Sequence, residues 1–317
     1  MKILANDGLS KSGIAALEKS GFEVLTTKVA QEQIINYINT HNINVLLVRS
    51  ATKVRHDIID NCPNLKIIGR GGVGIDNIDV DYARSKGIQI INTPEASSES
   101  VAELVFAHLF TGVRFLHDAN RNMPLEGDMN FDGLKKAYSN GIELKGKTLG
   151  IIGFGKVGKE VARIGLGLGM KIIASDKSIG KAEIKVVFYN GQSINVEIET
   201  EPISAIYKHA DFITIHVPTQ EEGYIIGKEE LDAMKKDVGI INCARGGVID
   251  EVALIEALDN EKVLFAGLDV FENEPSPEIQ ILMHPKISLT PHIGAATLEA
   301  QERIGIELAE QIIEILR

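Results

Sequence analysis

Cysteine, basic side chains and long apolar runs are all scarce in this sequence of 317 residues. Its two cysteines, Cys62 and Cys243, match no zinc-ligand spacing and provide no disulfide framework, a usage typical of a reducing cytoplasm. No apolar run reaches the roughly 18 residues that a membrane span requires. Acidic residues outnumber basic ones by 44 to 33, a net charge of −11, so most of the surface would repel a nucleic-acid backbone. We therefore expect a cytoplasmic enzyme that has no metal site and binds neither nucleic acid nor membrane.

The sequence is long enough for two domains of roughly 150 residues each. Its hydrophobic share of 44% is ample for two packed cores. In residues 1–97, short runs that are apolar throughout alternate with amphipathic stretches, which favours a parallel sheet covered by helices on both faces. The expected strands are Lys2–Ala5, Phe22–Thr26, Val45–Val48 and Leu65–Gly69, and the expected helices are Ser10–Ser20, Gln31–Thr40 and His56–Asn61.

A long helix is expected next, from near Ser98–Ser100 to about Leu116. Its start carries Ser100-Val101-Ala102-Glu103, which has the form of a capping box. After a polar arm over residues 119–146, a second βαβ series is expected. Its strands are expected at Thr148–Ile152, Lys171–Ala174, Phe212–Val217, Gly239–Cys243, Leu264–Leu268 and Ile287–Thr290.

Two more elements complete the expected organisation. Residues 186–198 place β-forming side chains on both sides of Asn190-Gly191, which predicts a hairpin inserted into the second series. The chain closes with a helix from about Ala296 to Arg317, whose apolar face is expected to contain Ile304, Leu308, Ile312 and Ile315.

Gly153-Phe154-Gly155-Lys156-Val157-Gly158 is a G-x-G-x-x-G motif, which is weak evidence alone in a chain with 30 glycines. Here it follows an expected strand, opens a helix over residues 159–168 and precedes Asp176. Gly153 permits the tight turn, Gly155 lets a pyrophosphate approach the backbone, and Gly158 lets helix and strand pack closely. Asp176 can accept hydrogen bonds from a ribose diol and would repel a 2′-phosphate, which favours NAD over NADP. The alternative is a glycine-rich turn without a ligand.

Three segments follow expected strands of the second series, where open α/β sheets bind ligands: residues 242–247, 269–275 and 290–294. They contain Arg245, Glu274 and His292, a set suited to hydride transfer at a 2-hydroxy acid. Arginine can hold a carboxylate or carbonyl oxygen. Histidine can exchange the hydroxyl proton near neutral pH, and a neighbouring carboxylate raises the pKa of an imidazole. From the residues alone, Glu272 rivals Glu274, and each of these side chains can equally be structural.

These segments and the glycine motif together resemble the D-isomer-specific 2-hydroxyacid dehydrogenase family over essentially the full length. Three further segments resemble its members that oxidise D-3-phosphoglycerate: residues 47–54, 68–77 and 143–150. The resemblance implies that Arg245 binds substrate, that His292 is the acid–base catalyst and that Glu274 is its partner. It also implies two doubly wound α/β domains with a cleft between them. The Rossmann NAD-binding domain would span residues 98–293, and the flavodoxin-like substrate domain residues 1–97 and 294–317.

The resemblance further implies contacts with the cofactor NAD. Besides the glycines of the motif and Asp176, these contacts fall on Val73, Lys156, Val157, Val217, Cys243, Ala244, Asp269 and Gly294. Asp269 is expected near the nicotinamide carboxamide, and Cys243 is expected to line the site and not to act as a nucleophile. Family members are usually homodimers joined through the nucleotide domain, which would bury part of the helix over residues 101–116 and the arm.

Arg49, Lys53, Arg55 and Arg70 form two basic segments in an otherwise acidic chain, suited to a phosphate dianion, although solvated strand-end side chains are the alternative. The resemblance makes Arg49 and Arg70 substrate contacts. Consecutive N–H groups in the turn Gly71-Gly72-Val73-Gly74 can form an anion nest, so we expect Gly71, Gly72 and Val73 to contact the substrate carboxylate. For the two remaining basic residues, Lys53 and Arg55, the resemblance decides nothing. The implied reaction oxidises D-3-phosphoglycerate to 3-phosphohydroxypyruvate, the first step of serine biosynthesis. The alternatives are a glyoxylate or hydroxypyruvate reductase, another D-2-hydroxyacid dehydrogenase, or an NAD-sensing scaffold without catalysis.

Two features depart from the family pattern. The sequence contains no counterpart of the carboxy-terminal regulatory domain that binds serine in many phosphoglycerate-oxidising members, so feedback inhibition by that route is not expected. The hairpin around Asn190-Gly191 is longer than the usual family connection, and its role is open.

Overall fold

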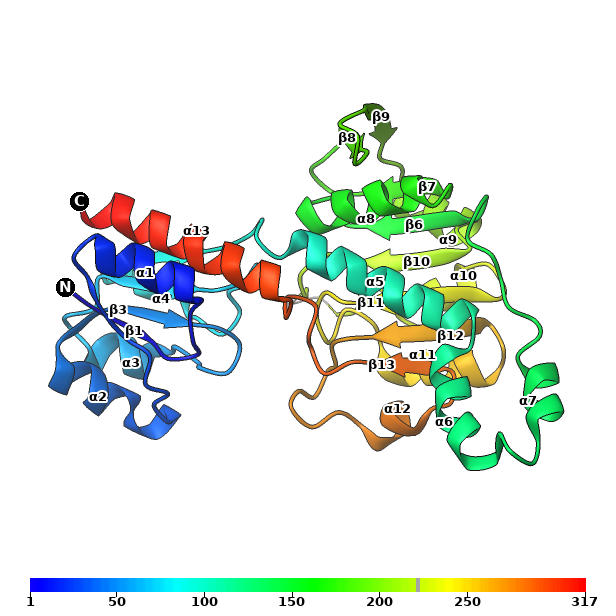
Figure 1. Ribbon diagram of the computed structural model, residues 1–317, viewed down its shortest axis with the longest axis horizontal. Helices are drawn as coiled ribbons and strands as arrows, with labels where there is room; N and C mark the ends of the chain where they lie inside the picture. The colour runs from blue at the N-terminus through cyan, green and yellow to red at the C-terminus, as the bar shows by residue number, and fades with distance from the viewer. Residues whose placement is uncertain (221–222) are drawn as a thin grey trace. The chain divides into compact units, whose positions relative to one another are not determined.

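The computed structural model describes residues 1–220 and 223–317, which fold into two α/β units (Figure 1). The terminal unit comprises Met1–Ser100 and Ala295–Arg317, and the central unit comprises Val101–Gly294. The first boundary lies three residues after the expected one and the second boundary one residue after it.

The terminal unit is built on a parallel sheet of five strands in the order β2-β1-β3-β4-β5. Successive residues of its first strand point to opposite faces, so that Ile3 and Ala5 pack in one hydrophobic layer and Leu4 in the other. Burial on both faces explains why Ile3, Leu4 and Ala5 of this strand are all apolar. The strands are β1 (Lys2–Ala5), β2 (Glu23–Leu25), β3 (Ile43–Val48), β4 (Ile67–Arg70) and β5 (Gln89–Asn92).

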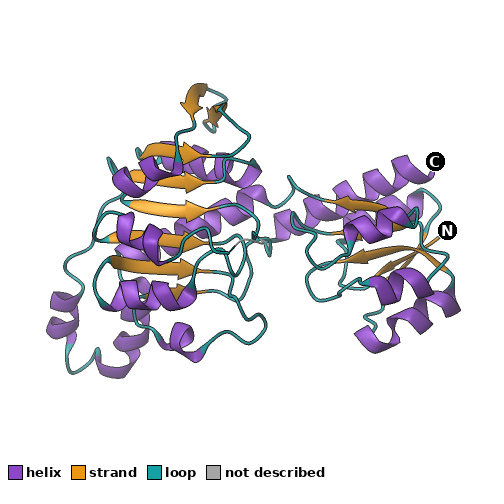
Figure 2. Cartoon of the chain, turned by 180° about the vertical axis from the view of Figure 1, so that it is seen from behind, coloured by secondary structure: helices purple, strands orange, loops and turns teal. Residues whose placement is uncertain are grey.

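Helices cover both faces of this sheet (Figure 2). On one face, α1 (Lys11–Lys19) packs beside α13 (Leu298–Leu316), which buries Ile304, Leu308 and Ile312. Ile315 was expected on the same face of α13, but it is 37% exposed, and Leu316 packs against the core in its place. The reason is the helical repeat of about 3.6 residues: Leu316 lies about one turn after the buried Ile312, so it and not Ile315 returns to the buried face. The other face carries η1 (Gln31–Gln33), α2 (Ile34–His41), α3 (His56–Asn61) and α4 (Val80–Ser85).

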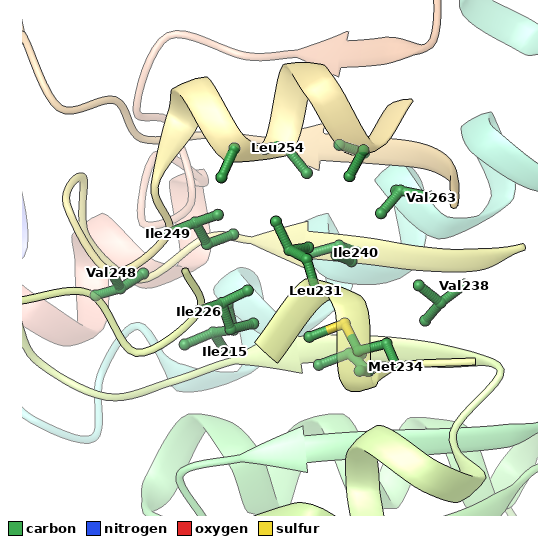
Figure 3. Packing of buried hydrophobic residues seen from close by; sticks show 14 of the residues in the cluster. Ile215, Ile226, Leu231, Met234, Val238, Ile240, Val248, Ile249, Leu254 and Val263 are labelled. Carbon is green, nitrogen blue, oxygen red and sulfur yellow. The ribbon is translucent and has the colours of Figure 1, made fainter. Parts of the chain in front are cut away.

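The central unit contains a second parallel sheet, which within its described residues runs in the order β13-β12-β11-β10-β6-β7. A hydrophobic layer lies on each face. Figure 3 shows one layer, where Leu231 of α10 and Leu254 of α11 approach Ile240 of β11. The other layer packs under α5 and α8 and includes Phe154 and Phe212. The strands are β6 (Thr148–Ile152), β7 (Lys171–Ser175), β10 (Phe212–Ile215), β11 (Val238–Asn242), β12 (Val263–Leu268) and β13 (Ile287–Leu289). The helices include α8 (Lys156–Gly167), α9 (Ile203–His209), α10 (Lys228–Ala233), α11 (Glu251–Asp259) and α12 (Ile279–Met283).

The long helix α5 (Ser98–Val113) begins before the expected capping box. Ser100 therefore lies inside the first turn, and its hydroxyl is 2.7 Å from Oγ1 of Thr297 instead of capping the helix. The capping-box interpretation is wrong, because the sequence pattern does not reveal this tertiary partner. The arm that follows contains two helices, α6 (Leu116–Glu126) and α7 (Phe131–Ala137).

The predicted hairpin is confirmed as the antiparallel pair β8 (Lys181–Val187) and β9 (Ser193–Glu199). Its inner side chains Ile184 and Ile198 are buried in the layer beneath α8. Where the hairpin rejoins the sheet, the N–H of Glu201 donates to the carbonyl oxygen of Ala174 at 2.8 Å. The insertion is therefore anchored to β7 and leaves the pairing of β6 with β7 intact.

Candidate active site

Most of the predicted site residues follow the carboxyl ends of the central strands. Because these strands are parallel, the segments after them begin at the same edge of the sheet. The strand order reverses between β6 and β10: the chain runs from β6 to β7 on one side and then crosses to β10 on the other. Open α/β sheets bind ligands at such reversals.

The glycine motif lies at this reversal. Gly153 has a φ of +92°, in the left-handed region, and a Cβ there would lie 2.5 Å from the carbonyl oxygen of His216. A Cβ at Gly158 would lie 2.2 Å from the oxygen of Gly153, whereas one at Gly155 would meet no heavy atom within 4 Å. Gly155 is also the N-cap of α8 and provides no side-chain cap for its first N–H groups. This open turn, rich in donors, fits the pyrophosphate of a dinucleotide.

Asp176 follows β7 directly, and four hydrogen bonds hold its carboxylate. Oδ2 accepts the N–H of Phe154 at 2.7 Å. Oδ1 accepts the N–H and hydroxyl of Ser178, at 2.9 and 3.0 Å, and the N–H of Ile179 at 3.0 Å. Burial alone would raise the pKa of Asp176, but these donors together lower it. An ionised carboxylate is therefore tied to the glycine motif, while its role as a ribose acceptor stays a prediction.

His292 and Glu274 form a hydrogen-bonded pair. Nδ1 of His292 lies 2.8 Å from Oε2 of Glu274, and Oε1 of Glu274 accepts the N–H of Phe271 at 3.0 Å. Burial alone would raise the pKa of Glu274, but His292, the Phe271 N–H and the charge of Arg245 together lower it. Because Nδ1 faces the carboxylate, Nε2 is the ring nitrogen that can exchange a proton with a substrate.

The loop that carries His292 is fixed by a buried carboxylate. His292 has a φ of +55°, which is unusual for a residue other than glycine, and its N–H donates to the carbonyl oxygen of Asp269 at 2.8 Å. The side chain of Asp269 is buried and accepts the hydroxyl of Thr290 at 2.6 Å and the N–H groups of Ile293 and Gly294, both at 2.8 Å. Asp269 thus holds the backbone of His292 in a strained conformation. Its contact with a carboxamide stays a prediction.

His108 of α5 supports the same loop, a role that no sequence pattern indicated. Its ring nitrogens lie 2.9 Å from the hydroxyls of Ser288 and Thr290, which are 180 and 182 residues away in the chain. Burial lowers the pKa of His108, although Asp269 opposes this effect, so the ring is favoured in its neutral form.

Arg245 lies in the loop after β11, which Asn242 shapes by donating from its side-chain amide to the carbonyl oxygen of Arg245 at 2.8 Å. The next residue, Gly246, packs against the loop after β12. A Cβ at Gly246 would lie 1.8 Å from the carbonyl oxygen of Phe271, so this approach requires glycine. The contact places the loop of Arg245 against the loop that leads to Glu274.

A pocket of about 400 Å³ opens beside His292 and Glu274, a volume within the range of small-molecule sites. Apart from Glu274, Thr290 and His292, its walls are apolar: Phe271, Pro275, Pro277, Leu282, Leu289 and Pro291. An apolar wall lowers the local dielectric and so strengthens the attraction between an imidazolium and a carboxylate.

In the terminal unit, Arg49 and Arg70 lie against one glycine turn. A Cβ at Gly72 would lie 2.6 Å from Nη1 of Arg70, and a Cβ at Gly71 would lie 3.6 Å from Cγ of Arg49. Asp7, which sequence reasoning missed, accepts the N–H of Arg49 at 2.7 Å. Burial lowers the pKa of Arg49, and Asp7 opposes that effect. The side chains of Arg49 and Arg70 therefore pack against the same glycine turn.

The other two basic residues do not join this cluster. Nη1 of Arg55 lies 2.6 Å from Oδ1 of Asp79, and its Nη2 donates to the carbonyl oxygen of Asp76 at 3.0 Å. Lys53 is exposed. The guanidinium of Arg55 is thus engaged by residues 76 and 79, while the side chain of Lys53 faces solvent.

The remaining predicted cofactor contacts differ in exposure. Val73 and Lys156 are exposed, whereas Val157, Val217 and Ala244 are half-buried. Cys243 is buried, and burial raises the pKa of its thiol well above the ordinary value, which disfavours the reactive thiolate. Its place in the lining of a cofactor site stays a prediction.

Two kinds of feature are missing from residues 1–220 and 223–317. In these residues, no group of three or more His, Cys, Asp or Glu side chains is arranged to hold a metal ion. Nor does any helix among them have both the length and the apolar character needed to cross a membrane.

The parallel sheet and the glycine turn at its strand-order reversal define a dinucleotide-binding α/β protein. Residues 106–294 match the model of the NAD-binding domain of D-isomer specific 2-hydroxyacid dehydrogenases. The chain belongs to this family of NAD-dependent dehydrogenases.

Two curated relatives are equally similar to the chain. D-3-phosphoglycerate dehydrogenase of Methanocaldococcus jannaschii is 43% identical over 318 residues, which cover 100% of this chain but 58% of that protein. Hydroxypyruvate reductase of Thermotoga maritima is 43% identical over 320 residues, covering 99% of this chain and 98% of that protein. The chain therefore spans little more than half of the first relative and nearly all of the second.

The fold also matches a solved structure. The crystal structure of a glyoxylate reductase from Paecilomyes thermophila has a TM-score of 0.81 and 27% sequence identity with this chain, and the match covers 99% of this chain and 95% of the other.

Proposed function

We propose that this chain catalyses the NAD-dependent oxidation of D-3-phosphoglycerate to 3-phosphohydroxypyruvate. The contact of 2.8 Å between His292 and Glu274 carries the proposal, because it supplies a group able to exchange the proton of a C2 hydroxyl. Identity to a phosphoglycerate dehydrogenase and to a hydroxypyruvate reductase is 43% in both cases, so it does not favour either substrate. Arg49 and Arg70, packed against the Gly71-Gly72 turn, favour the phosphorylated one.

In this reaction Nε2 of His292 takes the hydroxyl proton as C2 gives up a hydride. Bound NAD supplies the hydride acceptor. Arg245 binds the substrate and stabilises the developing carbonyl oxygen. Glu274 stabilises the imidazolium that forms, and Asp269 keeps the backbone of His292 in position.

Steady-state kinetics with phosphorylated and unphosphorylated hydroxy acids and with both cofactors test the proposal. Efficient oxidation of D-3-phosphoglycerate with NAD supports it. Equal use of glycerate would favour a glyoxylate or hydroxypyruvate reductase. A chain that binds NADH and turns over no 2-hydroxy or 2-oxo acid would favour a sensing scaffold.

Arg49→Ala is expected to raise the KM for D-3-phosphoglycerate about 10- to 100-fold, the equivalent of one lost charge-assisted hydrogen bond. The KM for an unphosphorylated hydroxy acid is expected to change little. Arg55→Ala is the matched control, because that guanidinium is bound to Asp79. Equal losses for both substrates would refute a phosphate-binding role for Arg49.

Asp176→Ala is expected to lower the ratio of kcat/KM with NAD to that with NADP by about 10- to 100-fold. The substitution removes an acceptor for the ribose diol and a charge that repels a 2′-phosphate. Because Asp176 also binds Phe154 and Ser178, we expect weaker binding of both cofactors, and the ratio is the informative quantity. Asp176→Asn removes the charge but keeps an acceptor oxygen, so it separates the contributions of these two properties to cofactor choice. An unchanged ratio in the alanine variant would contradict the role of Asp176 in cofactor choice.

We further propose a cytoplasmic homodimer joined through the central unit. Exposed apolar side chains on α5, α6 and the segment up to the start of α7 support the dimer: Phe110, Leu116, Met123, Leu125, Met129 and Phe131. Two buried cysteines that form no disulfide are consistent with a reducing compartment. The mass of the protein in solution, compared with that of one chain, tests the dimer.

A further inference from the structure

Two glutamates, Glu251 and Glu272, are hydrogen-bonded through the backbone of the loop that carries Glu274. Glu251 is the first residue of α11 and is only 7% exposed. Its Oε1 accepts the N–H of Glu272 at 2.9 Å, and Oε1 of Glu272 accepts the N–H of Glu251 at 3.1 Å. These reciprocal bonds, here called the carboxylate clasp, join the start of α11 to the loop after β12.

The clasp keeps two acidic side chains together in an unfavourable setting. Burial raises the pKa of Glu251, and Glu272, Glu278 and Glu274 raise it further, although the bond from Glu272 N–H lowers it. The amino terminus of α11 offsets part of the repulsion, because helix amino termini stabilise negative charge. Asp250 already caps this helix by accepting the N–H groups of Val252 and Ala253, so the clasp is not needed to cap it.

Consecutive backbone N–H groups bind the clasp and the carboxylate of Glu274. The N–H of Glu272 binds Glu251, and the preceding N–H, that of Phe271, binds Oε1 of Glu274 at 3.0 Å. With Oε1 held in this way, Oε2 of Glu274 faces Nδ1 of His292 at 2.8 Å. The orientation of the Phe271–Glu272 backbone therefore determines where the carboxylate of Glu274 points.

The same backbone segment contacts the loop of Arg245. A Cβ at Gly246 would lie 1.8 Å from the carbonyl oxygen of Phe271 and 2.9 Å from the nitrogen of Glu272. A shift of this segment would therefore disturb Arg245 and Glu274 together.

We infer that Glu251 and Glu272 are positioning residues for the reaction, which set the backbone of the Glu274 loop so that Glu274 faces His292. The inference rests on the proposed function, because it assigns the clasp to the same acid–base pair. Neither residue acts on the substrate directly: the effect of each passes through Glu274.

The test compares Glu251→Ala with Glu251→Gln in the full chain. Both variants lack the charge of Glu251, but the amide oxygen of glutamine can still accept the N–H of Glu272. We expect Glu251→Ala to lower kcat about 10- to 100-fold, the scale of a small misplacement of a catalytic group. Its pH profile for oxidation is expected to move to lower pH relative to that of Glu251→Gln, because a displaced Glu274 stabilises the imidazolium less. Glu251→Gln is expected to keep kcat within about threefold of the unaltered chain.

A second pair and a control complete the experiment. Glu272→Ala and Glu272→Gln are expected to repeat the contrast, since Oε1 of Glu272 is the acceptor in the other half of the clasp. Glu256→Ala, on the same helix and bound to Lys228 at the surface, is expected to leave kcat unchanged. Thermal unfolding of each variant measures stability separately from kcat.

The outcomes separate this inference from the function on which it depends. Lower stability of Glu251→Ala with kcat and pH profile unchanged would overturn the inference, because it would show a purely structural role. Equal losses in the alanine and glutamine variants would also overturn it, because charge and not the hydrogen bond would then matter. If Glu274→Gln itself left the pH profile unmoved, the proposed acid–base pair would be the part that fails.

Discussion

His292→Asn is expected to lower kcat about 10²- to 10⁴-fold, the usual contribution of a general acid–base group. Asparagine cannot exchange a proton near neutral pH. It does tolerate the left-handed backbone of this position, where φ is +55°, better than most residues other than glycine. The loss should therefore reflect the missing imidazole and not a collapsed loop. Kinetics of oxidation, with NADH binding measured by fluorescence, check this result.

The affinity for NADH is expected to stay close to that of the unaltered chain, because the glycine motif is untouched. His209→Asn is the matched control, since His209 is an exposed residue at the end of α9 in the same unit. Retention of more than about a tenth of kcat by His292→Asn would exclude His292 as the acid–base group.

Glu274→Gln is expected to move the pH profile of oxidation to lower pH. Oxidation needs a neutral imidazole to accept the hydroxyl proton. A carboxylate 2.8 Å from Nδ1 stabilises the protonated ring, and the amide of glutamine does not. Without the carboxylate the imidazolium loses its hydrogen-bonded anionic partner, so we expect the acidic limb of the profile to shift down. We also expect kcat to fall about 10- to 100-fold, because the imidazolium formed in the reaction loses its partner.

The pH dependence of kcat/KM measures this shift. Glu278→Gln makes the same chemical change nearby on a carboxylate that binds the side chain of Asn273, and it should leave the profile in place. A profile that is identical in Glu274→Gln and the unaltered chain would disprove the pairing.

Features that depend on local pattern could be predicted from the sequence. Strands buried on both faces are apolar throughout, and β1, β3 and β6 were expected within two residues of their observed bounds. The hairpin followed from Asn190-Gly191, and the glycine motif followed from its place between a strand and a helix. The choice of Glu274 over Glu272 as the partner of His292 came from family resemblance, and the structure places Glu274 there.

Features that depend on contacts between distant residues were missed. Ser100 has the sequence context of a helix cap, yet its hydroxyl contacts Thr297, which lies 197 residues away. His108 and Glu251 look like ordinary helical residues until their partners are seen. Sequence spacing specifies which side chains share one face of a helix, but not which loop from another strand will meet them.

The residues proposed for chemistry and those proposed for phosphate recognition belong to different parts of the chain. Arg245, Glu274 and His292 lie in the central unit, whereas Arg49 and Arg70 lie in the terminal unit. Under the proposed function, a few substitutions in the terminal unit would change the preferred substrate and leave the residues proposed for hydride transfer unaltered. Related enzymes can thus differ in substrate while they share one catalytic unit. This agrees with the equal identity of the chain, 43%, to a D-3-phosphoglycerate dehydrogenase and to a hydroxypyruvate reductase.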